Sequence, residues 1–265
     1  MSMSSIRGGS SVYQIPGRTA PARGTLPLSV RLVKRSADLA ISSVGLLILA
    51  VALPLIAVAI YLDSPGPLFY RQRRAAALRG RSSSGRCEFA LFDMLKFRTM
   101  RIGAEAKTGA VLADVDDPRV TRVGRFLRKT RLDELPQLWN VFKGEMSMVG
   151  PRPERPELLE NLTLAIPFFE ERMRDCRPGI TGLAQISLSY SGRAPEHSKL
   201  AALENSLNNP YGFEMARGAL ADDMRTKLLF DLAYVAGLER FSTFILTELL
   251  VMVKTPLVML RGLGR

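Results

Sequence analysis

The sequence predicts an α+β protein that is mainly helical, with a membrane helix, a small β-hairpin and interfacial amphipathic helices around a compact domain. Three observations support this prediction. Residues 39–62 form an uncharged apolar run of 24 residues, long enough to cross the core of a bilayer as a helix. Residues 68–74 and 88–100 are candidate strands, the second with partial two-residue alternation. Residues 227–260 have a helical pattern, and their second half, 241–260, is amphipathic.

Composition divides the chain into three parts. Residues 1–30 are rich in Ser, Gly, Arg and Pro and show no apolar period, so they predict a flexible basic tail. Residues 31–63 contain the membrane helix, and residues 64–265 form the remaining domain. A buried core helix would also be apolar, but a helix of this length that is apolar all round is unusual in a domain of this size.

The membrane helix contains a proline and has basic residues on both sides. Pro54 lies inside the apolar run and should kink the helix. Under the positive-inside rule, a helix that simply crosses the bilayer has its basic flank on one side only. A re-entrant helix, which bends near Pro54 and leaves through the face that it entered, accounts for both observations; a true crossing is the alternative. The flanking cations are Lys34 and Arg35 before the run, and Arg71, Arg73 and Arg74 after it.

The charge of the chain implies an anionic partner. A formal net charge of +12 and a pI near 10.2 suit nucleic acid, anionic lipid or a phosphorylated substrate. Aromatic residues make up only 7% of the chain, and the apolar run would be hard to keep in solution, so we expect no nucleic-acid partner. The two cysteines, Cys87 and Cys176, form no disulfide framework and fit a reducing compartment.

A single histidine, His197, restricts the chemistry of the chain. A Ser-His-Asp triad, a Cys-His dyad or a histidine-based zinc site has almost no material to work with. If the chain is an enzyme, its chemistry must therefore use carboxylates, lysines and arginines, with Mg²⁺ as the candidate metal.

The connections around the two candidate strands are basic or polar. Residues 75–86 predict an exposed basic loop between the strands. In the second strand, Lys96 and Arg98 should point to the same side, as a solvated edge or as a phosphate-binding face. Residues 101–120 are polar and predict a loop with little regular structure.

Two adjacent carboxylates, Asp133 and Glu134, directly follow a run of five cations and form the most distinctive feature of the chain. Pro136 is tolerated only in a first helical turn, so a helix should begin near Leu132 or Asp133. An acidic pair at a helix N-terminus, faced by guanidinium groups, can hold a phosphate or a metal-bound phosphate, and the helix should lower the carboxylate pKa. The alternative is an N-cap and a first-turn dipole partner without chemistry. The cations are Arg122, Arg125, Arg128, Lys129 and Arg131.

Two further arginines lie beside rigid turns. Pro151 and Pro153 flank Arg152 and restrict its backbone, so the guanidinium is presented with little entropy left to lose. Arg177 precedes a Pro-Gly turn in the segment 177–185. Structural turns explain each cluster about as well as function when each is taken singly.

Taken together, these segments resemble one family, the monotopic phosphoglycosyl transferases, also called bacterial sugar transferases. The match runs in the correct order over residues 31–255, roughly, and the combined motifs are far more specific than any single one. They are KR…D at Lys34, Arg35 and Asp38, SPGPLFYRQRR from Ser64, LKFRTM from Leu95, DDPRVTRVGRFLRKTRLDELPQLWNVFKGEMSMVGPRP from Asp116, and RPGITGLAQ from Arg177.

The resemblance implies a reaction. Members transfer a sugar-1-phosphate from a UDP-sugar to undecaprenyl phosphate through a phospho-aspartyl intermediate and release UMP, as the first membrane step of exopolysaccharide, O-antigen or glycoconjugate synthesis. By this resemblance Asp133 is the nucleophile and Glu134 the Mg²⁺ ligand. The matching phosphate-binding positions are Lys96, Arg128, Arg152 and Arg177.

The resemblance also implies a location. Residues 64–265 would form a catalytic domain on the cytoplasmic face of the bacterial inner membrane, in contact with membrane lipids. The family's re-entrant helix breaks at a Ser-Pro pair, whereas here Leu53 precedes Pro54.

Three points stay open at this level. A non-catalytic, membrane-anchored scaffold of polysaccharide assembly is the alternative function, with the basic clusters binding lipid headgroups only. The apolar C-terminal segment is suited to homodimer formation. Sugar specificity is expected in residues 185–225, which show no legible code.

Overall fold

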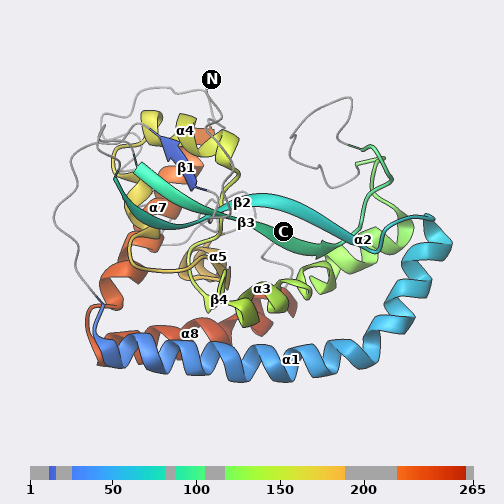
Figure 1. Cartoon of the computed structure of the whole chain (residues 1–265), viewed down its shortest axis with the longest axis horizontal. Helices are drawn as coiled ribbons and strands as arrows, with labels where there is room; N and C mark the ends of the chain where they lie inside the picture. Colours follow the sequence, from blue (N-terminus) through green and yellow to red (C-terminus); the bar gives the residue numbers. More distant parts are fainter. Residues whose placement is uncertain (1–11, 16–25, 82–86, 105–116, 189–219, 261–265) are drawn as a thin grey trace.

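The long apolar segment forms one continuous helix, α1 (Leu28–Asp63), at the base of the molecule (Figure 1). The structure, a computed structural model, describes residues 12–15, 26–81, 87–104, 117–188 and 220–260. Figure 1 shows α1 running along the base and then turning sharply upwards in its second half, the half that contains Pro54. The kinked apolar helix predicted from the sequence is therefore present.

Three polar side chains from the first half of α1 anchor it to the domain. Lys34 Nζ donates to the carbonyl of Val149 at 3.0 Å and forms an ion pair with Glu248 at 2.6 Å. Arg35 donates to the carbonyls of Val141 and Phe142, at 2.8 and 2.7 Å, near the C-terminus of their helix, where a cation also complements the helix dipole. These contacts fix the helix to α3 (Gln137–Lys143), β4 (Ser147–Val149) and α8 (Phe241–Leu260).

Asp38 is the third anchor of α1. Its buried carboxylate accepts hydrogen bonds from Ser147 Oγ at 2.9 Å and from the N–H of Met148 at 2.8 Å. The segment KR…D is therefore a docking motif that joins α1 to the domain.

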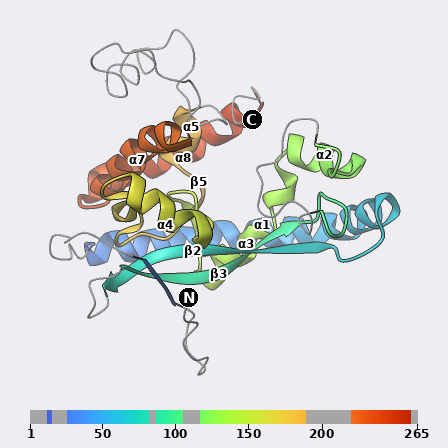
Figure 2. The same cartoon turned by 90° about the horizontal axis from the view of Figure 1, so that it is seen from above.

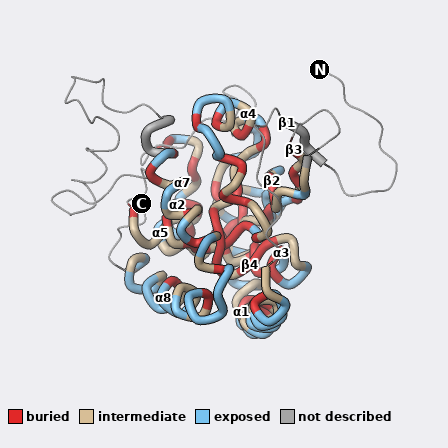
Figure 3. The backbone as a smooth tube through the Cα atoms, turned by 90° about the vertical axis from the view of Figure 1, so that its left-hand side faces the viewer, coloured by how far each residue is buried: buried red, intermediate tan, exposed pale blue. Residues whose placement is uncertain are grey.

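The outer surfaces of α1 and α8 are apolar. Both helices are long and apolar enough to cross a membrane, and only 11% of the most apolar stretch of each helix is buried in the protein. Side chains such as Val51, Leu55 and Leu62 are 85%, 77% and 77% exposed. Figure 3 shows the two helices side by side at the base with their outer faces exposed. Apolar surfaces of this extent mark contact with a membrane or a partner.

A long antiparallel hairpin crosses the domain above α1 (Figures 1 and 2). Its strands are β2 (Phe69–Arg81) and β3 (Cys87–Phe97), and β1 (Val12–Ile15) pairs with the outer edge of β3 in the order β1-β3-β2. A second sheet has two parallel strands, β4 and β5 (Gly179–Thr181).

Two sequence predictions in this region are wrong. The strand β1 lies within residues 1–30, which were predicted to be a flexible basic tail, so that prediction fails for residues 12–15; residues 1–11 and 16–25 lie outside the described residues. Residues 75–81, predicted as part of an exposed loop, instead extend β2, because Ala75 and Ala76 are buried in the core. The rest of the predicted loop, 82–86, lies outside the described residues. Shifts in the register of β2 occur between Ala75 and Gly80, where its alternation breaks down.

Helices and short turns follow the hairpin in the chain. They are α2 (Arg122–Lys129), the 3₁₀ turn η1 (Leu132–Glu134), α3, α4 (Pro156–Ala165), the 3₁₀ turn η2 (Phe169–Met173), α5 (Leu183–Ser187), α7 (Leu220–Gly237) and α8. Of these, α3, α4 and the two 3₁₀ turns contact the strands of the sheet. The helix α2 was not predicted, because its cations concealed a cap and an apolar face. The side chain of Thr121 accepts the N–H of Gly124 at 3.0 Å, and Leu127 is buried.

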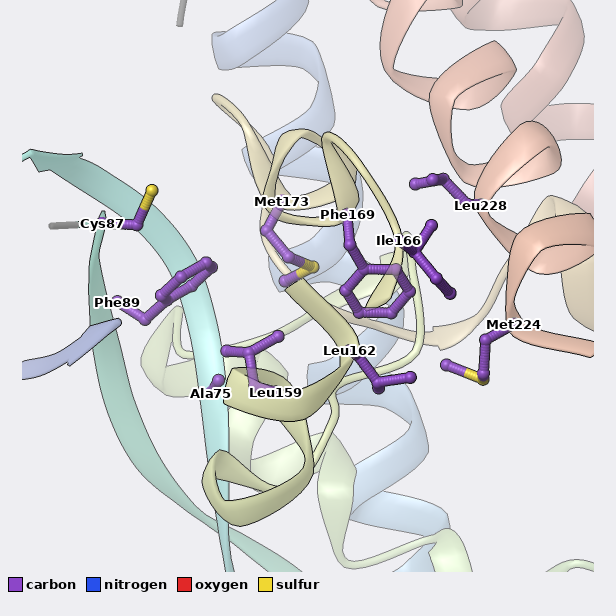
Figure 4. Close-up of a cluster of buried hydrophobic side chains, with 10 residues drawn as sticks. All are labelled: Ala75, Cys87, Phe89, Leu159, Leu162, Ile166, Phe169, Met173, Met224 and Leu228. Carbon is purple, nitrogen blue, oxygen red and sulfur yellow. The ribbon is translucent and has the colours of Figure 1, made fainter. Parts of the chain in front are cut away.

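The largest buried cluster joins the far end of the hairpin to α4, η2 and α7 (Figure 4). Phe89 on β3 packs beside Leu159 on α4, while Phe169 on η2 lies between α4 and Leu228 of α7. This packing sets the position of the segment 150–155, which leads into α4 and contributes to the site described next.

Candidate active site

The two adjacent carboxylates lie on the turn η1, directly before α3. Asp133 is 7% exposed and Glu134 is 8% exposed, so both are largely withdrawn from water. Arg131, the residue before the turn, has φ of 59°, a left-handed conformation that a non-glycine residue adopts at a cost of about 1–3 kcal/mol. The sequence predicted a helix start near Leu132; the structure has a 3₁₀ turn there, and α3 begins at Gln137.

Glu134 is held by two cations that come from distant parts of the chain. Its Oε1 atom accepts hydrogen bonds from Lys96 Nζ at 3.0 Å and from Arg152 Nη2 at 2.8 Å. Burial alone would raise the pKa of Glu134, but Arg152 and Lys96 outweigh burial and hold it well below its usual value. Glu134 is therefore ionised at neutral pH and places a negative charge between the two cations.

Asp133 has a different environment from its neighbour. Its carboxylate has no hydrogen bond or ion pair with any residue in the described part of the chain. Burial, followed by the negative charge of Glu134, raises the pKa of Asp133, and the cations of Lys96, Arg128 and Arg131 oppose that rise only in part. Among the described residues Asp133 is therefore a buried carboxylate without a bonding partner, and burial destabilises its ionised form.

The direction of this pKa shift corrects an expectation from the sequence. A helix N-terminus was expected to lower the carboxylate pKa and keep the group ionised. The residues are instead on a three-residue 3₁₀ turn, whose dipole is short, and burial beside Glu134 dominates. The pKa of Glu134 is lowered, but by Arg152 and Lys96 and not by a helix N-terminus.

This arrangement predicts a pH dependence. If Asp133 is the nucleophile that the family resemblance implies, its carboxylate must be ionised to attack, so kcat/KM should fall as the pH drops through the raised pKa of Asp133. Because the positive charge of Lys96 lowers this pKa, Lys96→Met should move the acidic limb of the profile to higher pH and reduce kcat. The measurement is the pH profile of kcat/KM for both enzymes. Lys143→Met, which removes an exposed cation paired with Glu145, should leave the limb in place. A limb that moves to lower pH in Lys96→Met would contradict this electrostatic assignment.

Arg152 is positioned by arginines that sequence reasoning missed. Arg172 is fully buried on η2, and its Nη2 donates to the carbonyl of Arg152 at 3.0 Å. Arg74 on β2 donates to the carbonyl of Pro153 at 2.9 Å, and burial together with the charge of Arg152 lowers the pKa of Arg74 to about 10. The segment on both sides of Arg152 is therefore tied to two other elements. The hydrogen bond from Arg172 to Asp231, 59 residues away, has no signal in the sequence.

The other cations predicted to face a phosphate are held by different partners. Arg128, at the end of α2, donates to Thr99 Oγ1 at 2.8 Å, and its charge acts on Asp133. Arg98 does not share the face of Lys96: it is buried and binds Ser64 and the carbonyl of Pro67, at 2.6 Å for the latter.

Arg177 lies away from the dyad, on the side of α1. Burial and the charges of Arg35, Asp38 and Arg31 set its lowered pKa, and no contact joins it to Asp133 or Glu134 within the described residues. Its loop nevertheless lies against the Arg152 loop. A Cβ atom on Gly150 would meet the carbonyl of Arg177 at 2.4 Å, so this close approach requires glycine.

The dyad suits a metal that is shared with a substrate. Within the described residues no three acidic, cysteine or histidine side chains gather as a complete metal cage. Mg²⁺ in phosphoryl-transfer sites is usually bound through one or two carboxylates plus substrate phosphates, and adjacent carboxylates supply this minimum. Asp133 has no competing partner among the described residues, and Glu134 stays ionised, so the residues present fit such an ion.

Comparison with known proteins identifies the family. The model of the bacterial sugar transferase family matches residues 29–262, which is most of the chain. A Bacillus subtilis (strain 168) protein, provisionally named an undecaprenyl-phosphate N-acetylgalactosaminyl 1-phosphate transferase, is 49% identical over 163 residues, covering 62% of this chain and 83% of the relative.

Two other relatives are much longer than this chain. An Aeromonas hydrophila UDP-N-acetylgalactosamine-undecaprenyl-phosphate N-acetylgalactosaminephosphotransferase is 33% identical over 88% of this chain and 44% of its own length. The Escherichia coli (strain K12) UDP-glucose:undecaprenyl-phosphate glucose-1-phosphate transferase is 41% identical over 59% of this chain and 31% of its own length. With the family match spanning nearly the whole described fold, including the dyad and its cations, the chain belongs to the bacterial sugar transferase family of enzymes.

Proposed function

We propose that this protein transfers a sugar-1-phosphate from a UDP-sugar to undecaprenyl phosphate through a covalent intermediate on Asp133. The observation that supports this most strongly is the contrast within the dyad: Asp133 has no hydrogen bond or ion pair with a described residue, while Glu134 is held ionised by Lys96 and Arg152. The names of the relatives support the donor and acceptor classes.

The reaction has two displacements at one phosphorus atom. A carboxylate oxygen of Asp133 attacks the phosphorus that bears the sugar, the bond from this phosphorus to the bridging oxygen breaks, and UMP leaves with that oxygen. An oxygen of undecaprenyl phosphate then attacks the same phosphorus and releases Asp133, which gives undecaprenyl-diphospho-sugar. Two in-line steps replace one difficult transfer, and no histidine is needed.

The cations around the dyad bind and orient the phosphates. Lys96, which precedes the dyad in the sequence, and Arg152, which follows it, both bind Glu134, and Arg128 adds a third positive charge. Mg²⁺, held mainly by Glu134, would neutralise diphosphate charge that otherwise repels Asp133. Arg177, on the α1 side, is assigned to a phosphate that extends beyond the dyad. Such groups act by positioning and charge stabilisation, which supply most of the catalysis in phosphoryl transfer.

The test of this function is a UMP-release screen. The purified full chain is incubated with polyprenyl phosphate and each member of a panel of UDP-sugars, since the named sugars of the relatives include both N-acetylgalactosamine and glucose. We expect UMP release over many turnovers that requires both the lipid and Mg²⁺ with at least one donor; without the lipid, no more than one UMP per enzyme should appear. Absence of turnover with every donor would favour the scaffold alternative. Residues 189–219, the greater part of the segment expected to choose the sugar, lie outside the described residues.

We further propose that α1 is re-entrant and that the domain lies on the cytoplasmic face of the inner membrane, where it can also form a homodimer through its apolar helices. The bend of α1 and its exposed apolar side chains support re-entry (Figure 1). A leaflet-embedded enzyme meets its lipid acceptor at headgroup depth, which gives the location a chemical reason.

Single-cysteine labelling tests this topology. The native Cys87 and Cys176 are buried, and burial raises the pKa of Cys176 to about 12, so both should react slowly with alkylating reagents. Ser29→Cys before the apolar run and Glu157→Cys on α4 are exposed positions on either side of it. Re-entry predicts that an impermeant reagent labels both from the same side of sealed vesicles. Labelling from opposite sides would show that α1 crosses the bilayer.

A further inference from the structure

A polar pocket of about 170 Å³ lies where α1 ends and α2 begins, apart from the dyad. Three exposed arginines line it: Arg101, Arg122 and Arg125. Within the part of the chain that the structure describes, none of these three side chains has an ion pair or hydrogen bond. Guanidinium groups gathered without carboxylate partners favour an anionic ligand, and their planar donors suit phosphate.

The two carboxylates in the same pocket are engaged by other groups. Asp117 is held by Arg119 through hydrogen bonds of 2.6 to 3.0 Å, which lower its pKa to about 2. Asp63 accepts the N–H of Val123 at 2.7 Å and so caps the start of α2. Because Arg119 already offsets Asp117, the pocket keeps a net positive charge.

An apolar pocket of about 340 Å³ lies at the same end of α1. It is lined by Val58, Tyr61, Leu62 and Leu68, among others. Leu62 lines the apolar pocket and Asp63 lines the polar one, so consecutive residues of α1 separate the two. Asp63 is also the first charged residue after the uncharged run 39–62, and in a membrane such a position marks headgroup depth. The pair of pockets therefore matches an amphiphile with a phosphate head and an apolar chain.

The position and size of the polar pocket separate it from the reaction site. Neither Asp133 nor Glu134 lines it, and the cations that act most strongly on Asp133 are Lys96, Arg128 and Arg131. The polar pocket is smaller than the roughly 300–1,000 Å³ of sites that enclose a whole small-molecule ligand. It fits a headgroup phosphate better than a nucleotide-sugar, and a phosphate held there would not be the reacting one.

From these observations we infer that the α1–α2 corner binds the phosphate of an anionic membrane phospholipid, with a chain of that lipid in the apolar pocket. This inference rests on the membrane placement in the proposed function, but not on its chemistry. Figures 1 and 2 place α2 beside the second half of α1. A bound lipid would link these two elements. It would thereby keep Arg128, at the other end of α2, in the position from which its charge acts on Asp133.

The test is lipid-dependent stabilisation of the full chain in an uncharged detergent. Phosphatidylglycerol should raise the unfolding temperature, whereas phosphatidylcholine with the same chains should not, because a ligand that binds only the folded state stabilises it. Arg122→Gln/Arg125→Gln should weaken the apparent affinity for phosphatidylglycerol about 10- to 30-fold. Arg79→Gln/Lys143→Gln removes two cations from exposed positions of β2 and α3 outside the pocket, and it should bind like the unmodified protein.

Several results would overturn the assignment. Equal stabilisation by both lipids, or an unchanged response in Arg122→Gln/Arg125→Gln, would remove the headgroup site. The same stabilisation by inorganic phosphate alone would show an anion site without a lipid. A raised KM for polyprenyl phosphate in the double variant, with no loss of phosphatidylglycerol binding, would assign the pocket to the acceptor. Lipid binding by Asp133→Asn should be normal, so failure of the proposed reaction and failure of this site are distinguishable.

Discussion

Asp133→Asn should abolish the release of UMP from a UDP-sugar in the presence of polyprenyl phosphate. The substitution preserves shape but removes the attacking oxygen charge, so we expect kcat to fall by at least about four orders of magnitude, equivalent to about 5.5 kcal/mol in the barrier. Because the Asp133 carboxylate has no hydrogen bond or ion pair with a described residue, the variant breaks no internal contact and should remain folded.

The covalent role gives a second readout for Asp133. With a donor labelled in the sugar phosphate and no acceptor present, the unmodified enzyme should retain label after denaturation, whereas Asp133→Asn should retain none. Asp93→Asn is the matched control, since Asp93 is an exposed carboxylate paired with Arg73 at 3.1 Å on the same hairpin. Near-normal turnover in Asp133→Asn would remove this residue from the mechanism. If that active variant also retained no label, the sugar phosphate would pass directly between the two substrates.

Much of the site could be predicted from the sequence because its signals are local. Asp133 and Glu134 are adjacent, Arg152 lies between two prolines, and Pro54 interrupts an apolar run. Each of these features limits the backbone or the charge without reference to the rest of the fold. The structure brings Lys96, Arg152 and Glu134 together, as the grouping of motifs implied.

The predictions failed where pairing across the chain decides the result. Strand β1 exists because Val12–Ile15 meets the edge of β3 about 75 residues later, and a four-residue segment in a basic tail has no local sign of that partner. The end of β2 is similar: Ala75 is too small to suggest a core position, yet it packs beside Phe89 and Leu159. The helix α2 could have been found, since Thr121 precedes apolar residues at helical spacing.

The arginines show most clearly the difference between what a local sequence signal reveals and what the tertiary fold decides. A run of guanidinium groups predicts an anionic ligand but does not say which members meet it. Arg98 is buried under the loop after α1, Arg172 supports the Arg152 loop from within the core, and Arg177 faces α1. Only burial and partners distinguish these roles, and both depend on the tertiary fold.

The Arg172–Asp231 ion pair connects the core to catalysis and should give the largest loss of stability of any single change in the domain. Arg172 and Asp231 side chains are 2% and 3% exposed and lie 2.7 Å apart, with Glu154 at 3.4 Å and the Phe169 ring 4.9 Å from the guanidinium carbon. Arg172→Met leaves the Asp231 carboxylate buried without its cation, so unfolding free energy should fall by about 3–5 kcal/mol.

Replacing both partners separates stability from positioning. Arg172→Met/Asp231→Leu removes the unpaired charge, and apolar replacement of a buried pair is often neutral, so thermal stability should largely return. Activity should not return with it, because the carbonyl of Arg152 still lacks the donor from Arg172, and the guanidinium that holds Glu134 is no longer fixed. We expect a higher KM for the UDP-sugar together with a lower kcat, measured at a temperature where both variants are folded. Arg73→Met, which breaks the exposed pair with Asp93, should cost no more than about 1 kcal/mol and leave both constants unchanged. Recovery of full activity in the double variant would show that Arg172 serves the fold alone, and that Arg152 finds its place without it.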